Sequence, residues 1–348
     1  MNRMKGLVLE KPNTFEVREL PIPELEQGEV LVRVKGCSIC GTDIRILEGK
    51  KTRGIRYPSV IGHEIAGVIV KTGGTVGDLK EGDRVGIIPV LSCHTCRYCL
   101  EGMENLCQNR KAIGYEFDGG FAEYLRVPAD AVRYGHVFKL PDGMSFEEGA
   151  LLEPLSCCFN GIQKAKLRVS DTCLIVGAGP IGLMHVQLAR AVGVSKIIVS
   201  EPNTMRLELS KRFGADFCVD PTKENLIEVV NQTTGGLGVD TIIMAIGVPG
   251  IVNDLLKVVR KGGTLNLFAG FPDAGTCTVE ANVIHYNEVT VNGTSSSTRL
   301  DYLKSASLVA QGSVRLQELV THRFPLEQFK EAYALAKEGR GIKILIEP

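Results

Sequence analysis

The chain has 348 residues, of which 44% are hydrophobic and 23% are charged, a composition typical of a globular protein with sizeable buried cores. Its 40 basic residues balance its 40 acidic ones, which excludes the net positive charge typical of proteins that bind nucleic acids or anionic membranes. No apolar run approaches the roughly 18 residues of a membrane span, and no signal peptide is recognisable, so we expect a cytoplasmic protein with a small-molecule ligand.

The first part of the chain, from Lys5 to about Ala131, consists of short β-rich segments separated by Gly, Pro and Asp. Residues Glu29 to Lys35 alternate apolar and polar side chains, which is the period of a half-buried strand. Because such segments recur at short intervals, this region is predicted to form antiparallel strands. A chain of this length is too long for one ordinary core, so we expect a second domain.

A different pattern begins at about Asp171, where apolar strands alternate with helical segments. The segments of this alternation are Thr172–Val176, Ile181–Val192, Lys196–Val199, Met205–Phe213, Glu224–Thr233, Val239–Ala245, Ile251–Val259 and Thr264–Phe268. Strands that are apolar on both faces and joined by helices indicate a parallel sheet covered on two sides. The sequence therefore predicts an α/β fold, with a nucleotide-binding domain at residues 156–292. Residues 1–155 and 293–348 are expected to form the β-rich domain, which ends in a strand at Ile342–Ile346.

Four of the eleven cysteines form a compact pattern, C-x2-C-x2-C-x7-C, at Cys93, Cys96, Cys99 and Cys107. An odd number of cysteines without a secretion signal makes disulfides a poor explanation. Four thiolates at this spacing can complete the tetrahedral shell of a structural zinc ion without another ligand. Unpaired cysteines or an iron–sulfur cluster are the alternatives. His94, inside the pattern, is interpreted as a spacer.

A second set of candidate metal ligands is dispersed along the chain and comprises Cys40, His63, Glu64 and Glu153. One thiolate, one imidazole and carboxylates can hold zinc and leave a position open for water or substrate. Each residue alone has a simpler explanation, because a single histidine is more often a core side chain and Cys40 could form a redox pair with Cys37. The hypothesis of a catalytic metal depends on their occurrence together with the quartet and with a glycine motif.

That glycine motif, GAGPIG, joins the strand Thr172–Val176 to the helix that follows. The residues expected to approach a dinucleotide are Gly177, Gly179, Pro180, Ile181 and Gly182. Glycines allow a tight turn there, and the helix amino terminus can face a pyrophosphate. A glycine turn without a ligand is the simpler alternative.

Two residues beyond the second strand bear on the choice of dinucleotide. Glu201 is placed to accept hydrogen bonds from the ribose hydroxyls, and its charge repels a 2′-phosphate, which favours NAD over NADP. Arg206 is the opposing feature, because a nearby arginine can accept that phosphate. In the last strand, Lys343 is expected to be a solvated lysine rather than a ligand of the pyrophosphate.

The GHE triplet at residues 62–64, the cysteine quartet and GAGPIG together resemble, in order and spacing, the zinc-containing medium-chain alcohol dehydrogenase family. The resemblance covers essentially the whole chain. Within the family, Leu151–Ser156 and Leu319–Glu327 are most similar to sorbitol and related polyol dehydrogenases, and Val199–Pro202 is also similar to L-threonine 3-dehydrogenases. The resemblance implies a GroES-like β-rich catalytic domain, a Rossmann domain with a doubly wound parallel sheet, and a homodimer or homotetramer.

The resemblance also implies roles for single residues. The catalytic zinc ligands would be Cys40, His63 and Glu64, with Glu153 as the fourth ligand or as the partner of a zinc-bound water. Asp43 would hold the His63 ring, and Thr42 would pass the substrate proton toward solvent. Cofactor contacts would come from Ile181, Glu201, Arg206, Phe268, Ala269, Thr294 and Ser295.

Two positions depart from the family pattern. Arg45 stands where many members carry the histidine that ends the proton relay, so the route of the proton differs. The segment Thr294–Thr298 lacks the arginine that sorbitol dehydrogenases keep near the substrate, and Arg299 could replace it only if the loop shifts.

These features predict an NAD-dependent enzyme with one catalytic and one structural zinc ion per chain. Its substrate would be a secondary alcohol of a polyol, which could be sorbitol-like or xylitol-like, a cyclitol or a sugar-alcohol phosphate. An L-threonine 3-dehydrogenase is the first alternative, since Arg45 or Arg299 could bind a carboxylate. A non-catalytic NAD-binding protein, like the inactive lens relatives of these enzymes, is the second, and it would have lost a catalytic ligand.

Overall fold

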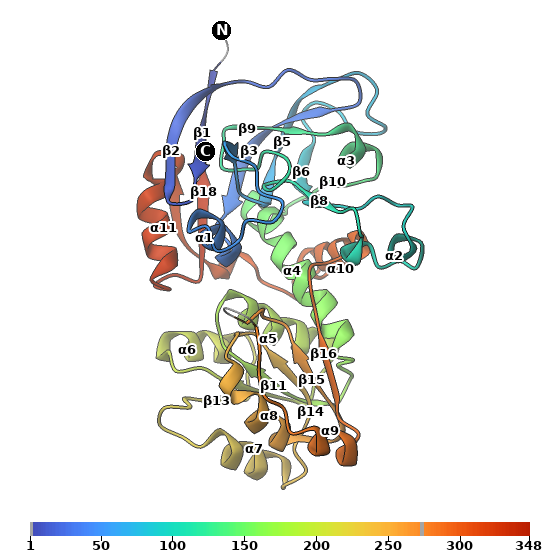
Figure 1. Cartoon of the computed structure of the whole chain (residues 1–348), viewed down its shortest axis with the longest axis vertical. Coiled ribbons are helices and arrows are strands. Elements are labelled where there is room, and N and C mark those ends of the chain that lie inside the picture. The colour runs from blue at the N-terminus through green and yellow to red at the C-terminus, as the bar shows by residue number, and fades with distance from the viewer. Residues whose placement is uncertain (1–2, 272–274) are drawn as a thin grey trace. The chain divides into compact units, whose positions relative to one another are not determined.

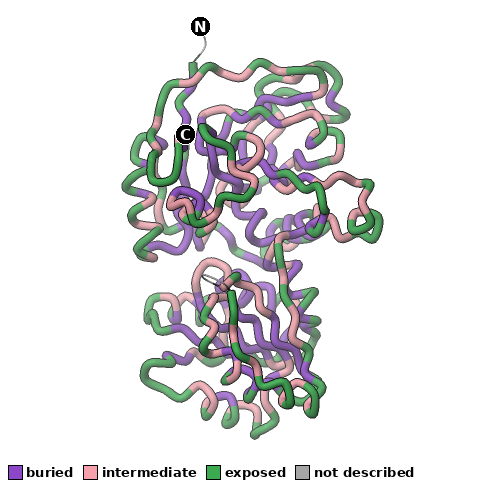
Figure 2. Tube along the Cα trace, in the orientation of Figure 1, coloured by how far each residue is buried: buried purple, intermediate pink, exposed green. Residues whose placement is uncertain are grey.

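The computed structural model describes residues 3–271 and 275–348, and the chain divides into two compact units. One unit contains Met1–Ser156, Ser297–Gln311 and Arg315–Pro348, and the other contains Cys157–Ser296 and Gly312–Val314 (Figure 1). Buried residues concentrate on the strands of each unit (Figure 2). Within the described residues, no helix is both long enough and apolar enough to cross a membrane.

The first unit is built around a seven-stranded sheet with the order β10-β6-β5-β3-β18-β17, in which β9 also pairs with β3. Its pairs are antiparallel except for β17 and β18, which are parallel. The strands are β3 (Val30–Ser38), β5 (Glu64–Thr72), β6 (Arg84–Ile87), β9 (Tyr124–Val127), β10 (Val137–Lys139), β17 (Val320–Pro325) and β18 (Lys343–Glu347). The strand β3, predicted one residue earlier at its start, is therefore central, with β5 on one side and β18 on the other.

Smaller elements complete this unit. A three-stranded sheet contains β1 (Arg3–Lys11), β2 (Thr14–Pro21) and β4 (Ser59–Val60), and a two-stranded one contains β7 (Val90–Leu91) and β8 (Lys111–Ala112). The α-helices are α1 (Gly41–Leu47), α2 (Arg97–Leu100), α3 (Ala129–Arg133), α10 (Arg299–Ala310) and α11 (Phe329–Lys337); the 3₁₀ helices are η1 (Glu104–Leu106), η3 (Gln317–Leu319) and η4 (Leu326–Gln328). The rings of Phe121 and Phe329 pack edge to face in the core, with centroids 4.8 Å apart, and so attach α11 to the sheets.

The second unit contains a six-stranded parallel sheet with the order β13-β12-β11-β14-β15-β16. Its strands are β11 (Thr172–Val176), β12 (Lys196–Ser200), β13 (Phe217–Val219), β14 (Val239–Met244), β15 (Val259–Leu267) and β16 (Thr290–Gly293). Numbered from β11, the order is 3-2-1-4-5-6, which is that of a doubly wound Rossmann sheet. The predicted α/β class with a doubly wound parallel sheet is therefore confirmed.

Helices cover this parallel sheet (Figure 1). They are α5 (Pro180–Val192), α6 (Thr204–Arg212), α7 (Leu226–Thr234), α8 (Val252–Val258) and α9 (Ala281–Asn287), with the 3₁₀ helix η2 (Pro249–Ile251). The helix α4 (Phe146–Lys164) contains the boundary between the two units at Ser156. Helix α5 begins at Pro180, whose fixed φ suits a first turn, and ends at Gly193, which has a left-handed φ of 92°.

The register of the parallel strands determines where the candidate cofactor contacts lie. Val176 aligns with Ser200 and with Met244, and Leu267 aligns with Met244 and with Gly293. The segments that follow β11, β12, β15 and β16 therefore start at one edge of the sheet. Ligands of open α/β sheets bind at this carboxyl edge.

Candidate functional site

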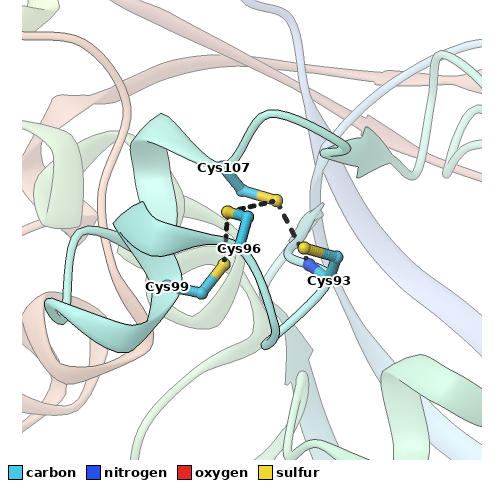
Figure 3. A group of neighbouring side chains, drawn as sticks. All are labelled: Cys93, Cys96, Cys99 and Cys107. Carbon is cyan, nitrogen blue, oxygen red and sulfur yellow. Dashed lines mark hydrogen bonds between the residues drawn. The ribbon is translucent and has the colours of Figure 1, made fainter.

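The four cysteines of the quartet lie together in one loop region of the first unit. Their sulfur atoms all lie within 4.8 Å of one another, and Figure 3 shows their side chains pointing toward one another. The Sγ of Cys96 lies 3.5 Å from that of Cys99 and 3.9 Å from that of Cys107. Four thiolates with Zn–S bonds of about 2.3 Å have sulfur atoms about 3.8 Å apart at the corners of the tetrahedron. The quartet therefore fits a zinc ion in both ligand type and size.

Backbone groups around the quartet donate hydrogen bonds to its sulfur atoms, while burial raises the pKa of the Cys99 and Cys107 thiols. The N–H groups of Cys93 and Asn109 donate to the Sγ of Cys107, at 3.2 Å and 3.3 Å. Hydrogen bonds from the Thr95 backbone and hydroxyl lower the pKa of the Cys93 thiol to about 5. His94 does not join the group, because its ring packs on Tyr134 with centroids 3.9 Å apart.

The second candidate metal group contains Cys40, His63 and Glu64, whose ligand atoms also lie within 4.8 Å of one another. Cys40 is the N-cap of α1, and its Sγ accepts a hydrogen bond from the Thr42 N–H at 3.5 Å. In return, Oδ2 of Asp43 accepts from the Cys40 N–H at 2.9 Å. This capping box fixes the position of the Cys40 sulfur at the amino terminus of α1.

Asp43 also positions the histidine. Its buried Oδ1 lies 3.1 Å from Nδ1 of His63, which leaves Nε2 as the ring atom available to a metal ion. Burial opposes a positive charge on His63, but Tyr115 and Asp43 outweigh it and raise the pKa of the imidazole well above its ordinary value. The surroundings of the ring therefore stabilise a cation there. This contact is the one that the resemblance implied for Asp43.

Gly62 explains how His63 reaches this position. Its φ is 100°, a left-handed conformation that favours glycine. A Cβ atom at residue 62 would lie 2.9 Å from Sγ of Cys37 and 2.9 Å from ring atoms of Phe121, all in the core. The close approach of the chain to the core thus needs glycine directly before the histidine. Cys37 is a buried free thiol and forms no disulfide with Cys40 in this structure.

The buried carboxylate of Glu64 lies beside the ammonium of Lys343, a residue that we expected from the sequence to be solvated. Nζ of Lys343 lies 2.6 Å from Oε1 of Glu64, and the two residues are 4% and 0% exposed. Ser38, directly opposite Glu64 in the register of β3 and β5, donates its hydroxyl to the same carboxylate. Burial lowers and the Glu64 charge raises the pKa of Lys343, with a net upward shift. The expectation of a solvated Lys343 is therefore wrong, because β18 lies inside the sheet next to β3.

The other two candidate catalytic residues lie near this group without being part of it. Glu153 is in α4, is 9% exposed, and is not among the residues whose ligand atoms lie within 4.8 Å of one another. Its carboxylate contributes to the raised pKa of Lys343, after the larger effects of burial and Glu64. Thr42 is partly buried in the first turn of α1. Tyr115, which no sequence motif singled out, packs its ring against His63 with centroids 5.5 Å apart.

In the second unit, the glycine motif forms the turn between β11 and α5. Gly177 has a φ of 93°, and a Cβ atom at Gly182 would lie 1.8 Å from the carbonyl oxygen of Gly177. Among the described residues, apart from its chain neighbours and the adjacent helix backbone, no atom lies within 4 Å of a Cβ built at Gly179, so the backbone there leaves room for a ligand. The open turn at the start of α5 fits a pyrophosphate.

Glu201 lies directly after β12 and contacts this turn. Its Oε2 accepts from the Ala178 N–H at 2.7 Å, and its Oε1 accepts from the Asn203 N–H at 3.1 Å. Nη1 of Arg206 lies 4.0 Å from Oε2, so the arginine partly neutralises the carboxylate. The acidic and the basic residue that bear on cofactor choice therefore lie side by side.

The looser cofactor candidates lie at the same sheet edge. The N–H groups of Phe268 and Ala269 donate to the carbonyl of Met244, at 3.2 Å and 3.1 Å. Thr294 accepts from the Asn266 side chain at 2.9 Å and follows β16, and Ser295 comes next in the chain. These residues and Gly177 thus lie at the same carboxyl edge of the parallel sheet.

The arginines considered for substrate binding have different surroundings. Arg299 donates from Nε to Oε2 of Glu104 at 3.1 Å, and its guanidinium also donates to the carbonyl of Tyr134. Because Glu104 already pairs with it, Arg299 is not available in this structure to bind a substrate carboxylate. Arg45, in α1, is exposed.

Comparisons with known proteins cover both units. Residues 26–142 match the alcohol dehydrogenase GroES-like domain, and residues 180–311 match the zinc-binding dehydrogenase domain. The chain is 35% identical over 352 residues to D-arabitol-phosphate dehydrogenase of Enterococcus avium, covering 99% of this chain and 97% of that protein. It is 32% identical over 351 residues to L-threonine 3-dehydrogenase of Bacillus velezensis, with 99% of each chain covered.

A solved structure also matches both units. A protein described as a zinc-binding dehydrogenase of Sinorhizobium meliloti 1021, bound to NADP, superposes with a TM-score of 0.92 and is 32% identical, with 100% of each chain covered. The expected combination of a GroES-like domain and a Rossmann domain is thereby confirmed. This chain belongs to the zinc-containing medium-chain alcohol dehydrogenase family and is an oxidoreductase that acts on alcohols.

Proposed function

We propose that the chain transfers hydride between a secondary alcohol of a polyol and NAD, with a catalytic zinc ion held by Cys40 and His63. The observation that carries this proposal is the contact of Asp43 with both ligands, through the Cys40 N–H at 2.9 Å and the His63 ring at 3.1 Å. Hydrogen bonds of this kind orient metal ligands in advance. A group that served only to pack the core would not need a buried carboxylate at its centre.

The bound groups would supply the reactive chemistry, since zinc polarises a hydroxyl as a Lewis acid and nicotinamide accepts hydride. The chain supplies the positions. Glu64 is a third candidate ligand, but Lys343 already neutralises it, whereas Glu153 lies nearby and remains a candidate fourth ligand or water partner. The Thr42 hydroxyl would accept the substrate proton and at the same time pass its own proton on. The guanidinium of Arg45 has hydrogen-bond donors but no acceptor, so the proton would leave to water at the exposed face of α1.

The cofactor-binding part of the proposal concerns the second unit. The turn from Gly177 to Gly182 would hold the pyrophosphate, and Glu201 would accept hydrogen bonds from the ribose. We assign NAD because the Glu201 carboxylate would repel a 2′-phosphate more strongly than Arg206, 4.0 Å away from it, could compensate. The residues after β15 and β16 would line the remainder of the cofactor site: Phe268, Ala269, Thr294 and Ser295.

The cysteine quartet would hold a second zinc ion with a structural role. Its four sulfur atoms leave no ligand position for a substrate. The proposed enzyme thus contains two zinc ions per chain and, like many members of its family, would assemble as a homodimer or homotetramer.

L-threonine is the second candidate substrate, because a named relative acts on it. The pairing of Arg299 with Glu104 removes one of the two arginines that could bind its carboxylate. The test is a comparison of sorbitol, xylitol, a cyclitol, D-arabitol phosphate and L-threonine at one pH, with either NAD or NADP, followed by absorbance of the reduced cofactor. Fastest turnover of a polyol or its phosphate with NAD is expected. Turnover of threonine alone would replace the proposal with its alternative.

A further inference from the structure

Near the candidate catalytic metal group, the Lys51 ammonium is repelled by the charges of three arginines: Arg45, Arg53 and Arg110. Lys51 is half-buried, and its Nζ lies 4.5 Å from the centroid of the Tyr115 ring. The same Tyr115 ring packs against His63, with centroids 5.5 Å apart. Lys51 and the candidate zinc ligand His63 therefore contact the same aromatic ring.

The turn after α1 brings the cations together. The N–H of Lys51 donates to the carbonyl of Arg45 at 3.1 Å, and its Nζ donates to the carbonyl of Arg53 at 3.3 Å. Burial, together with the charges of Arg110, Arg45 and Arg53, lowers the pKa of the Lys51 ammonium. Glu116 is the acidic residue that opposes this effect, and it contacts the same turn, since a Cβ atom at Gly54 would lie 2.3 Å from its Oε1.

Within residues 3–271 and 275–348, none of these four side chains forms an ion pair with an acid within 4.0 Å. Their neighbours in the same segment differ, because Lys50 pairs with Glu48 at 2.8 Å and Arg56 pairs with Asp118 at 3.0 Å. Arg45, Arg53 and Arg110 are exposed, so water screens most of their mutual repulsion, but Lys51 is half-buried and its repulsion is screened less. A bound anion would relieve the repulsion at Lys51.

We propose that this basic cluster, Arg45, Lys51, Arg53 and Arg110, binds the phosphate of the substrate, so that the substrate class is the monophosphate ester of a sugar alcohol. The inference rests on the proposed function and narrows it. A phosphate monoester carries about −1.5 to −2 charges at pH 7 and presents three acceptor oxygens, which suits several cations. A carboxylate carries one negative charge, which one arginine neutralises. A carboxylate ligand would therefore leave most of the positive charge of the cluster without a counter-charge.

The placement of the cluster also fits an elongated substrate. The hydroxyl to be oxidised would lie at the Cys40–His63 end and the phosphate at the Lys51 end, with the carbon chain passing along Tyr115. The ester group would be held at a distance from the reacting carbon, so it would improve binding and positioning without taking part in the chemistry.

The test compares matched substrates and variants of the zinc-loaded enzyme. D-arabitol, xylitol and sorbitol are each assayed as the free polyol and as the terminal monophosphate. Lys51→Gln and Arg110→Gln each remove one cation of the cluster, and Lys50→Gln is the control, because it removes a charge from the same segment that Glu48 already neutralises. Binding of the esters, of inorganic phosphate and of NADH is measured by calorimetry in parallel.

We expect kcat/KM for at least one ester to exceed that of its free polyol by 100-fold or more. Each cluster variant should lower kcat/KM for the ester by about tenfold to a hundredfold, mostly through KM, as expected when a charge-assisted contact to a bound anion is lost. The free polyol and NADH binding should change less than twofold. Inorganic phosphate should compete with the ester but not with the free polyol, and Lys50→Gln should behave as the parent enzyme.

The remaining outcomes separate this inference from the proposed function. Equal kcat/KM for the ester and the free polyol would overturn the inference of a phosphate site but would still support the proposed polyol dehydrogenase activity. Weaker NADH binding in Lys51→Gln would also overturn it, because the cluster would then serve the cofactor. If no polyol or ester is oxidised but ester binding disappears in both variants, the phosphate site stands and the polyol proposal fails. Absence of ester binding to the parent enzyme would overturn the phosphate site itself.

Discussion

Lys343 and Glu64 form a buried ion pair across the central strand β3, with Nζ and Oε1 2.6 Å apart. Removing the lysine leaves a carboxylate in the core without its cation, which typically costs about 3 to 5 kcal/mol. We therefore expect Lys343→Met to lower the urea midpoint strongly. Unfolding is followed by circular dichroism, because the chain has no tryptophan.

Matched variants separate the charge from the packing. Lys343→Arg, which keeps the charge, should lose less stability than Lys343→Met. The double variant Glu64→Gln/Lys343→Met should be more stable than Lys343→Met alone, since it no longer buries an unpaired charge. A loss below about 1 kcal/mol in Lys343→Met would mean that water or a metal ion neutralises Glu64 instead.

The candidate catalytic ligands can be tested apart from the cofactor site. Cys40→Ser or His63→Ala should abolish turnover and reduce the zinc content, because each removes a proposed ligand. NADH binding, measured by calorimetry, should remain nearly unchanged. Asp43→Asn should reduce kcat by about tenfold to a hundredfold through misorientation of His63. Equal losses of turnover and NADH affinity would contradict the separation of the two sites.

The cysteine quartet provides a prediction about metal stoichiometry. Cys96→Ser breaks the proposed tetrahedral shell, so the purified protein should lose one equivalent of zinc and unfold at a lower temperature. Cys173→Ser, which alters a buried cysteine far along the chain from either metal group, is the control for zinc content. Elemental analysis by mass spectrometry gives the count. The same zinc content in Cys96→Ser and the parent would rule out a metal at the quartet.

Glu201 should determine which dinucleotide is preferred. Glu201→Ala removes the acceptor for the ribose hydroxyls and the charge that repels a 2′-phosphate, so the ratio of kcat/KM for NAD to that for NADP should fall by at least tenfold. Part of the loss with NAD will come from the turn itself, because Glu201 accepts from the Ala178 N–H. Glu201→Gln keeps the size of the side chain and isolates the charge. A parent enzyme that prefers NADP would contradict the assignment.

His185 should make the protein sensitive to acid. Burial lowers its pKa to about 3, and neither ring nitrogen has a hydrogen-bond partner within the described part of the chain. The unfolded chain, with a pKa near 6.5, binds a proton that the folded chain does not, so stability falls as the pH drops from about 6.5 toward 3, by about 1.4 kcal/mol per pH unit. His185→Leu should remove this slope and leave stability at pH 8 nearly unchanged. Urea titrations at pH 8, 6 and 5 measure the difference, and an unaltered slope would contradict the assignment.

Much of the candidate site could be predicted from the sequence because it is built from local motifs. The quartet lies within one short segment, and the turn of GAGPIG is determined by its own glycines, so neither depends on distant packing. Cys40 and Asp43 belong to a single capping box, and only His63 had to be brought to them by the fold. That zinc and NAD occupy these positions stays a prediction.

Features that depend on strand order or on distant pairs were missed. The burial of Lys343 follows from the place of β18 beside β3, which no local pattern encodes. The pairing of Arg299 with Glu104 joins residues that are 195 positions apart in the chain. Helix α4 was not predicted at all, because Pro154 and Gly161 disfavour a helix and tertiary burial overrides them.

The position of β18 has a consequence for biosynthesis. The residues of the parallel sheet, 172–293, are all translated before Lys343, so the Rossmann unit can fold while the chain is still emerging from the ribosome. The other unit cannot complete its fold until β18 has been synthesised, because β18 is a strand of its central sheet and carries the counter-ion of Glu64. Proteolysis of stalled ribosome complexes should then find residues 157–296 protected before residues 3–156, although residues 3–156 are synthesised first.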